Sequence, residues 1–128
     1  MQSPFRDSPK SLNIFRIRFP IGAIASIGHR ISGVLLLFGL PVLALVLDRS
    51  LTSEAAFESL REAVDTPWWG LLLLALIWAA AHHVLAGVRH LLMDIGIGSP
   101  LDQARTSAWA VILTAVIIAI AAAIRWLA

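Results

Sequence analysis

The residues of this chain that are suited to chemistry are few, and they gather in two short segments. The 128 residues include four His, ten Lys and Arg, and eight Asp and Glu, but no Cys. The first segment holds Ser26, His29 and Arg30, and the second holds His82, His83, Arg89, His90 and Asp94. Because Cys is absent, disulfides, thiolate-bound iron–sulfur clusters and Cys-based zinc sites are excluded within the chain.

Helical spacing places these side chains on two polar faces. One face, with the spacing i, i+3, i+4, i+7, holds Ser26, His29, Arg30 and Gly33. The other, with the spacing i, i+4, i+7, holds His83, Gly87 and His90. Gly87 lacks a side chain one turn from His83, so a flat, bulky group or another helix can approach the backbone there. Two polar faces at equal depth predict one shared site.

The adjacent pair His82 and His83 points in two directions, about 100° apart around a helix. At most one of the two therefore faces the same target as His90, and the spacing favours His83. A low-spin haem needs two axial nitrogens, and one helix supplies only one per face at a given height, so the second must come from elsewhere. His90 lies about 10 Å further along the axis, where it could meet an acidic cofactor edge with Arg30 and Arg89 as nearby cations.

Each of these residues also has a structural interpretation. A single His in a membrane helix often serves as a hydrogen-bond partner between helices. Arg30 and Arg89 can extend to lipid head groups, and Ser26 can bond its own helix. Taken together, however, a Ser, two Arg, three His and an Asp at one depth favour an intramembrane cofactor or redox site.

The elements that must position these residues are membrane helices. The chain is 59% hydrophobic and 14% charged, with a mean hydropathy of +0.83, which excludes an ordinary soluble protein. We expect a single all-α integral membrane domain over residues 1–128. Its expected parts are a cytoplasmic arm (1–20), a first span (21–47), an outer loop (48–67), a second span (68–90), a cytoplasmic loop (91–105) and a third span (106–127).

The outer loop is expected to contain one short surface helix. Phe57, Leu60 and Val64 form a helical stripe, Ser53 is suited to cap the start, and Pro67 stops the helix. The distribution of charge predicts the orientation: seven of the ten Lys and Arg fall on the side of the N-terminus. We therefore expect a cytoplasmic N-terminus and all four His in the cytoplasmic half. The first 20 residues are polar and basic, so we expect no cleavable signal peptide.

Two motifs resemble the family of cytochrome b556 subunits of succinate dehydrogenase, which are membrane anchors of respiratory complex II. They are Ser-Ile-Gly-His-Arg-Ile-Ser-Gly at residues 26–33 and His-Val-Leu-Ala-Gly-Val-Arg-His-Leu-Leu-Met-Asp-Ile-Gly at residues 83–96. The run Ile-Arg-Phe-Pro-Ile at residues 17–21 is similar to proteobacterial members. One departure is visible, since Arg6 is followed by Asp7 where many members have Pro.

The resemblance implies three transmembrane helices that pack with a second three-helix anchor subunit around haem b. His83 matches the axial ligand of the haem iron, whose other axial His belongs to that second anchor. Ser26 and Arg30 match ubiquinone-site residues, and His29, Arg30 and His90 match the haem edge and its propionates. Arg89 and Asp94 would close the cytoplasmic end of the site or order the contact with the iron–sulfur subunit.

The function implied is that of a subunit of succinate:quinone oxidoreductase in the bacterial inner membrane, at the junction of the tricarboxylic acid cycle and the respiratory chain. The partners implied are the second anchor, the iron–sulfur subunit, the flavoprotein subunit and membrane lipids, with no nucleic acid. Electrons from succinate would reach the quinone through those soluble subunits, since this chain has no flavin or cluster motif.

Two alternatives remain open. One is an anchor of a quinol:fumarate reductase, which the haem midpoint potential and the bound quinone would distinguish. The other is a non-catalytic membrane assembly or transport subunit whose polar residues only pack helices. A purified complex without a Soret band would favour the latter.

Overall fold

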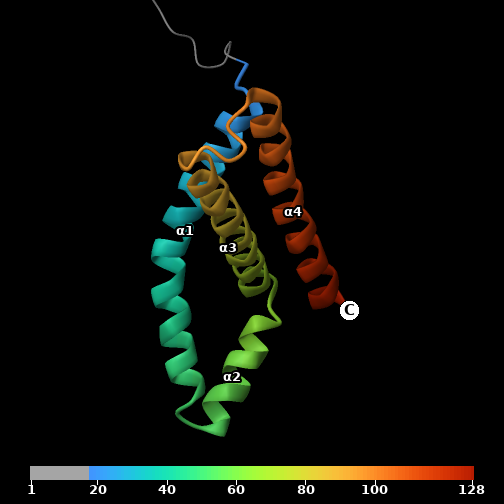
Figure 1. Cartoon of the computed structure of the whole chain (residues 1–128). Coiled ribbons are helices and arrows are strands. Elements are labelled where there is room, and N and C mark those ends of the chain that lie inside the picture. The colour runs from blue at the N-terminus through green and yellow to red at the C-terminus, as the bar shows by residue number, and fades with distance from the viewer. Residues whose placement is uncertain (1–17) are drawn as a thin grey trace, which may run out of the picture.

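The computed structural model describes residues 18–128, and all regular structure in that part of the chain is helical. Its helices are α1 (Ile21–Ser50), α2 (Glu54–Val64), α3 (Pro67–Asp94) and α4 (Leu101–Leu127), shown in Figure 1. Most of the expected N-terminal arm, including the Arg6 and Asp7 departure, lies outside the described residues. The all-α membrane fold predicted from hydropathy is confirmed.

Three of the four helices are long and apolar enough to cross a bilayer. α1, α3 and α4 have 30, 28 and 27 residues, more than the roughly 20 that a hydrocarbon core requires. The chain is therefore a multi-pass membrane protein. The helices extend beyond the expected spans: α1 continues to Ser50, α3 continues to Asp94, and α4 begins at Leu101. Hydropathy ends where charged residues appear, whereas backbone hydrogen bonding continues through them.

The short helix α2 forms as predicted. Ser53 is its N-cap, and the Ser53 Oγ accepts a hydrogen bond of 3.1 Å from the Ala56 amide. Pro67 occupies the first turn of α3, where its missing amide hydrogen costs nothing. Figure 1 shows α2 at the end of the molecule opposite the α3–α4 turn.

Two glycines make the tight turn between α3 and α4. Gly96 and Gly98 have φ angles of 84° and 75°, in the left-handed region that L side chains rarely adopt. The Gly96 amide donates to the Met93 carbonyl at 3.0 Å, and the Ile97 amide donates to the Leu92 carbonyl at 2.8 Å. This pair of bonds is a Schellman motif, which ends α3 and returns the chain so that α4 lies beside it.

The helix α3 is the centre of the bundle, since it packs against both α1 and α4, which contact each other less. The buried contact positions are mostly small, which lets the helix backbones approach closely. The small buried residues are Ala25 and Ser32 in α1, Gly70, Ala79 and Ala86 in α3, and Ala108 and Ala115 in α4. In Figure 1 the start of α1, the end of α3 and the start of α4 meet at one end of the bundle. The two His-bearing segments are brought to that end.

Candidate functional site

Three imidazoles from two helices meet between α1 and α3. The rings of His29 and His83 are stacked, with centroids 4.2 Å apart and an interplanar angle of 13°. The His90 ring meets His29 edge-on, at 5.3 Å and 65°. The prediction that the two polar faces lie together is confirmed for the rings of these three residues, which we call the His cluster.

The imidazole of His83 is held by the backbone of α1. Its Nδ1 lies 3.2 Å from the His29 carbonyl oxygen and 3.4 Å from the Ser32 Oγ. The Ser32 hydroxyl, which is fully buried, donates to the same carbonyl at 2.9 Å. Gly33 leaves room for the ring, because a Cβ there would lie 3.0 Å from its Cε1. The helical spacing does not predict Ser32 as a site residue, although Ser32 lies within the first motif, because it is one position off the polar face.

This geometry is suited to a metal-binding imidazole. When Nδ1–H donates to a carbonyl, the lone pair of a neutral imidazole lies on Nε2, and metal-ligating His residues commonly have such a backbone partner. Among the described residues, no group of three or more His, Cys, Asp or Glu is arranged to hold a metal ion by itself. His83 could thus act as one ligand of a metal whose other ligands are not a cluster of the described side chains.

Gly87 faces the ring of His29. A Cβ added at Gly87 would lie 3.4 Å from the His29 Nε2, so the ring lies just beyond the space that a side chain at this position would fill. Of the two expected neighbours, a flat group or another helix, the structure has the helix α1 on this side of Gly87, through His29.

His82 belongs to a different part of the interface. It is only 2% exposed, its Nε2 lies 3.2 Å from the Ala25 carbonyl oxygen, and its ring is stacked with Trp78 at 5.4 Å. As the helical angle predicted, only one of the two adjacent His residues joins His90, and it is His83.

Ser26 and Arg30 lie on the outward side of α1. Ser26 is half-buried and Arg30 is exposed. They are one turn apart, so they lie on the same side of the helix. A ligand bound by both would therefore lie at the surface of this chain rather than inside its bundle.

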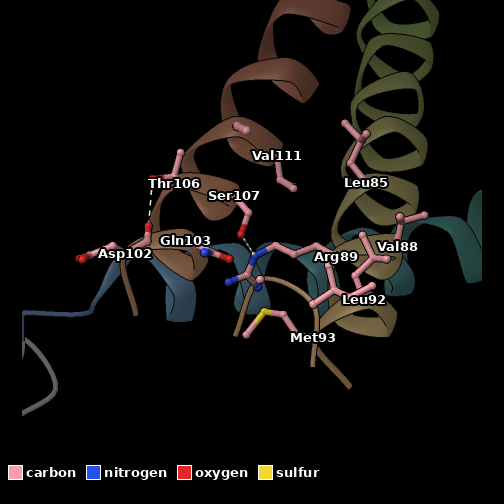
Figure 2. Close-up of a pocket in the computed structure, with 13 residues that line it drawn as sticks. Leu85, Val88, Arg89, Leu92, Met93, Asp102, Gln103, Thr106, Ser107 and Val111 are labelled. Atoms are coloured by element: carbon pink, nitrogen blue, oxygen red, sulfur yellow. Dashed lines mark hydrogen bonds between the residues drawn. The ribbon is translucent and has the colours of Figure 1, made fainter. Parts of the chain in front are cut away.

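Arg89 is directed away from the His cluster, contrary to the expectation that it acts as a cation beside His90. Its Nε donates to the Ser107 Oγ at 2.9 Å (Figure 2), and its Nη2 donates to the Ala104 carbonyl, also on α4 and at 2.9 Å. The side chain is 8% exposed. The reason is the 100° step between Arg89 and His90, which turns one residue to α4 and the other to α1. Asp94, at the end of α3, is exposed.

The contact of Arg89 with α4 lies along a groove of about 640 Å³ between α3 and α4, shown in Figure 2. Apolar side chains, among them Leu85, Val88 and Val111, line most of it, and Gln103 and Thr106 are polar. None of the four His is among its lining residues. The groove and the His cluster are therefore separate features on two sides of α3.

A protein-family model matches most of the chain. Residues 6–122 match the family model described as the succinate dehydrogenase/fumarate reductase transmembrane subunit. The chain belongs to this family. The resemblance inferred from the two motifs is thereby confirmed.

Similar proteins in the succinate dehydrogenase/fumarate reductase family match this chain over most of their length. The succinate dehydrogenase cytochrome b556 subunit of Paracoccus denitrificans is 36% identical over 113 residues, covering 88% of this chain and 86% of the relative. The subunit of the same name from Coxiella burnetii is 34% identical over 110 residues, covering 85% and 88%. That from Rickettsia felis is 26% identical over 117 residues, covering 91% of each. The chain is thus a transmembrane subunit of an enzyme complex of this family.

Proposed function

We propose that this chain is the membrane-anchor cytochrome b subunit of a succinate:quinone oxidoreductase in the bacterial inner membrane. It provides one axial ligand of haem b and helps form the site where ubiquinone is reduced. The observation that carries the proposal is the His83 imidazole, whose Nδ1 bonds the His29 carbonyl and whose Nε2 is thereby prepared to bind iron. The names of the bacterial relatives support the assignment.

The residues around His83 fit a haem shared with another subunit. His83 would bind the iron through Nε2, and the second axial His would come from the second anchor subunit. His29 and His90, with Arg30, offer N–H donors to the propionates at the haem edge. The haem supplies a one-electron carrier within the membrane.

Ser26 and Arg30 are the residues that would bind the quinone. The Ser26 hydroxyl donates a hydrogen bond to a quinone carbonyl oxygen, and the Arg30 guanidinium stabilises the negative charge that develops on that oxygen. Two electrons and two protons convert the quinone to the quinol, and oxidation of succinate to fumarate releases the same number. Because this chain has no Cys, the iron–sulfur clusters that deliver the electrons belong to a soluble partner, next to a flavoprotein subunit.

The test is to separate quinone reduction from succinate oxidation in the intact complex. In Arg30→Leu, we expect kcat/KM for ubiquinone to fall about 10- to 100-fold, and in Ser26→Ala by about 10-fold, because each removes a donor to developing charge. Succinate oxidation with a soluble dye should stay unchanged. Arg105→Leu, which removes an exposed Arg from α4, is the matched control. Equal loss of both activities would indicate failed assembly of the variant, whereas unchanged quinone reduction in Arg30→Leu and Ser26→Ala would contradict the proposal.

A second candidate is the anchor of a quinol:fumarate reductase, because the family description names both enzymes. That complex would use a lower-potential quinol to reduce fumarate. The haem midpoint potential and the quinone that copurifies with the complex distinguish the two directions. A purified complex without a Soret band would favour a subunit with a purely structural role.

A further inference from the structure

We propose that His82 is a positioning residue for quinone binding, which holds the segment of α1 that carries Ser26 and Arg30. This inference rests on the proposed function and extends it to a residue outside the His cluster. It is carried by three features: a hydrogen bond to α1, a glycine that admits the ring, and a stacking partner that holds the ring.

The hydrogen bond joins two buried groups. His82 is 2% exposed and Ala25 is 1% exposed, and the His82 Nε2 lies 3.2 Å from the Ala25 carbonyl oxygen. A carbonyl can only accept, so Nε2 carries the hydrogen and donates it. The acceptor belongs to the residue directly before Ser26. The bond therefore fixes the height and rotation of α1 at the start of the quinone-binding segment.

Gly28 makes the contact possible. A Cβ at Gly28 would lie 2.6 Å from the His82 Nε2 and 3.1 Å from its Cε1, too close for the ring to remain. Gly28 lies midway between Ser26 and Arg30 in the sequence. The imidazole thus packs against the α1 backbone at Gly28, within the segment that carries Ser26 and Arg30. A larger residue at position 28 would exclude the ring.

The ring is also held from its own helix. Trp78, one turn before His82 on α3, stacks with it at a centroid distance of 5.4 Å and an angle of 21°. This stacking favours the His82 rotamer that reaches the Ala25 carbonyl. The ring is consequently a fixed spacer between α3 and α1.

His82 and His83 together hold two successive turns of α1. His82 bonds the carbonyl of Ala25, and His83 bonds the carbonyl of His29, four residues further along. Ser26 lies between the two bonded carbonyls, and Arg30 directly follows the second. Removing the first bond leaves His83, at His29 and Ser32, as the His side chain that still bonds this segment of α1. The turn that carries Ser26 can then rotate or shift and displace both quinone-binding side chains.

The test compares four variants in the assembled complex. His82→Phe keeps an aromatic ring against Trp78 but removes the donor, whereas His82→Gln keeps an amide donor near the position of Nε2. Gly28→Ala places a Cβ in the space of the imidazole. Gly22→Ala is the matched control, because a Cβ there meets only the Arg89 Nη2, at 3.9 Å.

We expect His82→Phe and Gly28→Ala to raise KM for a short-chain ubiquinone about three- to tenfold, the effect of one lost hydrogen bond. The kcat at saturating quinone should change by less than about twofold. His82→Gln should return KM to within about twofold of the wild-type value, and Gly22→Ala should match the wild type. Haem per complex and succinate–dye activity should remain at the wild-type level.

Three outcomes would overturn the inference. An unchanged KM in His82→Phe and Gly28→Ala, with Arg30→Leu impaired, removes His82 from quinone binding and leaves the proposed function intact. Loss of haem and of complex in both variants, with an unchanged KM in what remains, makes His82 a packing residue only. If Arg30→Leu itself has no effect on quinone reduction, the proposed function fails and the inference fails with it.

Discussion

The His83 imidazole is fixed by a backbone carbonyl rather than by a carboxylate. The His29 carbonyl oxygen accepts from the Ser32 hydroxyl at 2.9 Å and lies 3.2 Å from the His83 Nδ1. A neutral partner suits a membrane interior, where an added carboxylate would carry a desolvation cost of several kcal/mol. The side-chain hydroxyl and the imidazole are both satisfied without a buried charge.

His83 is the residue on which haem binding should depend. In His83→Leu, we expect the assembled complex to lose its low-spin haem spectrum, because leucine offers no nitrogen to the iron. The pyridine-haemochrome content and the optical spectrum of the purified complex are the measurements. His82→Phe is the control and should keep the spectrum. An unchanged spectrum in His83→Leu would contradict the assignment and make His82 the next candidate.

Spacing alone was sufficient to group the His cluster. His29, His83 and His90 lie where the 3.6-residue period places them, since a helix is regular enough to carry side-chain direction over two turns. It was insufficient for Ser32 and Arg89. Whether an adjacent position is buried depends on which neighbouring helix lies against it, and one sequence does not contain that information.

At the scale of the helices, Arg89 is the brace between α3 and α4. Its guanidinium bonds a hydroxyl and a carbonyl in the first turns of α4, next to the Schellman turn that reverses the chain. Gly22 at the start of α1 is also near, since a Cβ there would lie 3.9 Å from the Arg89 Nη2. One side chain thus joins the three spans where they meet.

The prediction for Arg89 is a loss of stability without a change at the haem. Arg89→Met keeps the apolar stem but removes two charge-assisted hydrogen bonds, which contribute on the order of 2 kcal/mol. We expect the midpoint of thermal inactivation of quinone reductase activity to fall, while the haem spectrum stays unchanged. Arg105→Met, at an exposed position of α4, should leave both unaltered. A shifted haem spectrum in Arg89→Met would contradict this prediction and indicate that Arg89 acts at the haem.

At the scale of the molecule, much of the surface of the chain is apolar. Large apolar side chains on α1 remain exposed, for example Leu37 at 68%, Phe38 at 70% and Leu45 at 70%. Such a surface is satisfied by lipid tails or by another membrane helix, not by water. In the proposed haem site, His83 would supply one of the two axial nitrogens that a low-spin haem needs.

The prediction at this scale is that haem binding requires two chains. When the gene for the second anchor subunit is omitted from coexpression, membranes should contain no bis-His haem in complex with this chain. With all subunits present, the purified complex should hold one haem per copy of this chain. Haem content relative to the amount of this chain, from quantitative staining, is the measurement. A low-spin bis-His spectrum without the second anchor would contradict the shared site.

The sequence by itself determined the three long apolar helices, the capped helix α2 and the helical faces on which the polar residues lie, because hydropathy, capping and helical period act within one segment. Only the tertiary structure decided that α1 and α4 pack on different faces of α3. That arrangement turns His82 and His83 to carbonyls on two successive turns of α1, and Arg89 to α4. The physical reason is that a helical period specifies the angle between neighbouring side chains, whereas their partners depend on contacts between segments far apart in the chain.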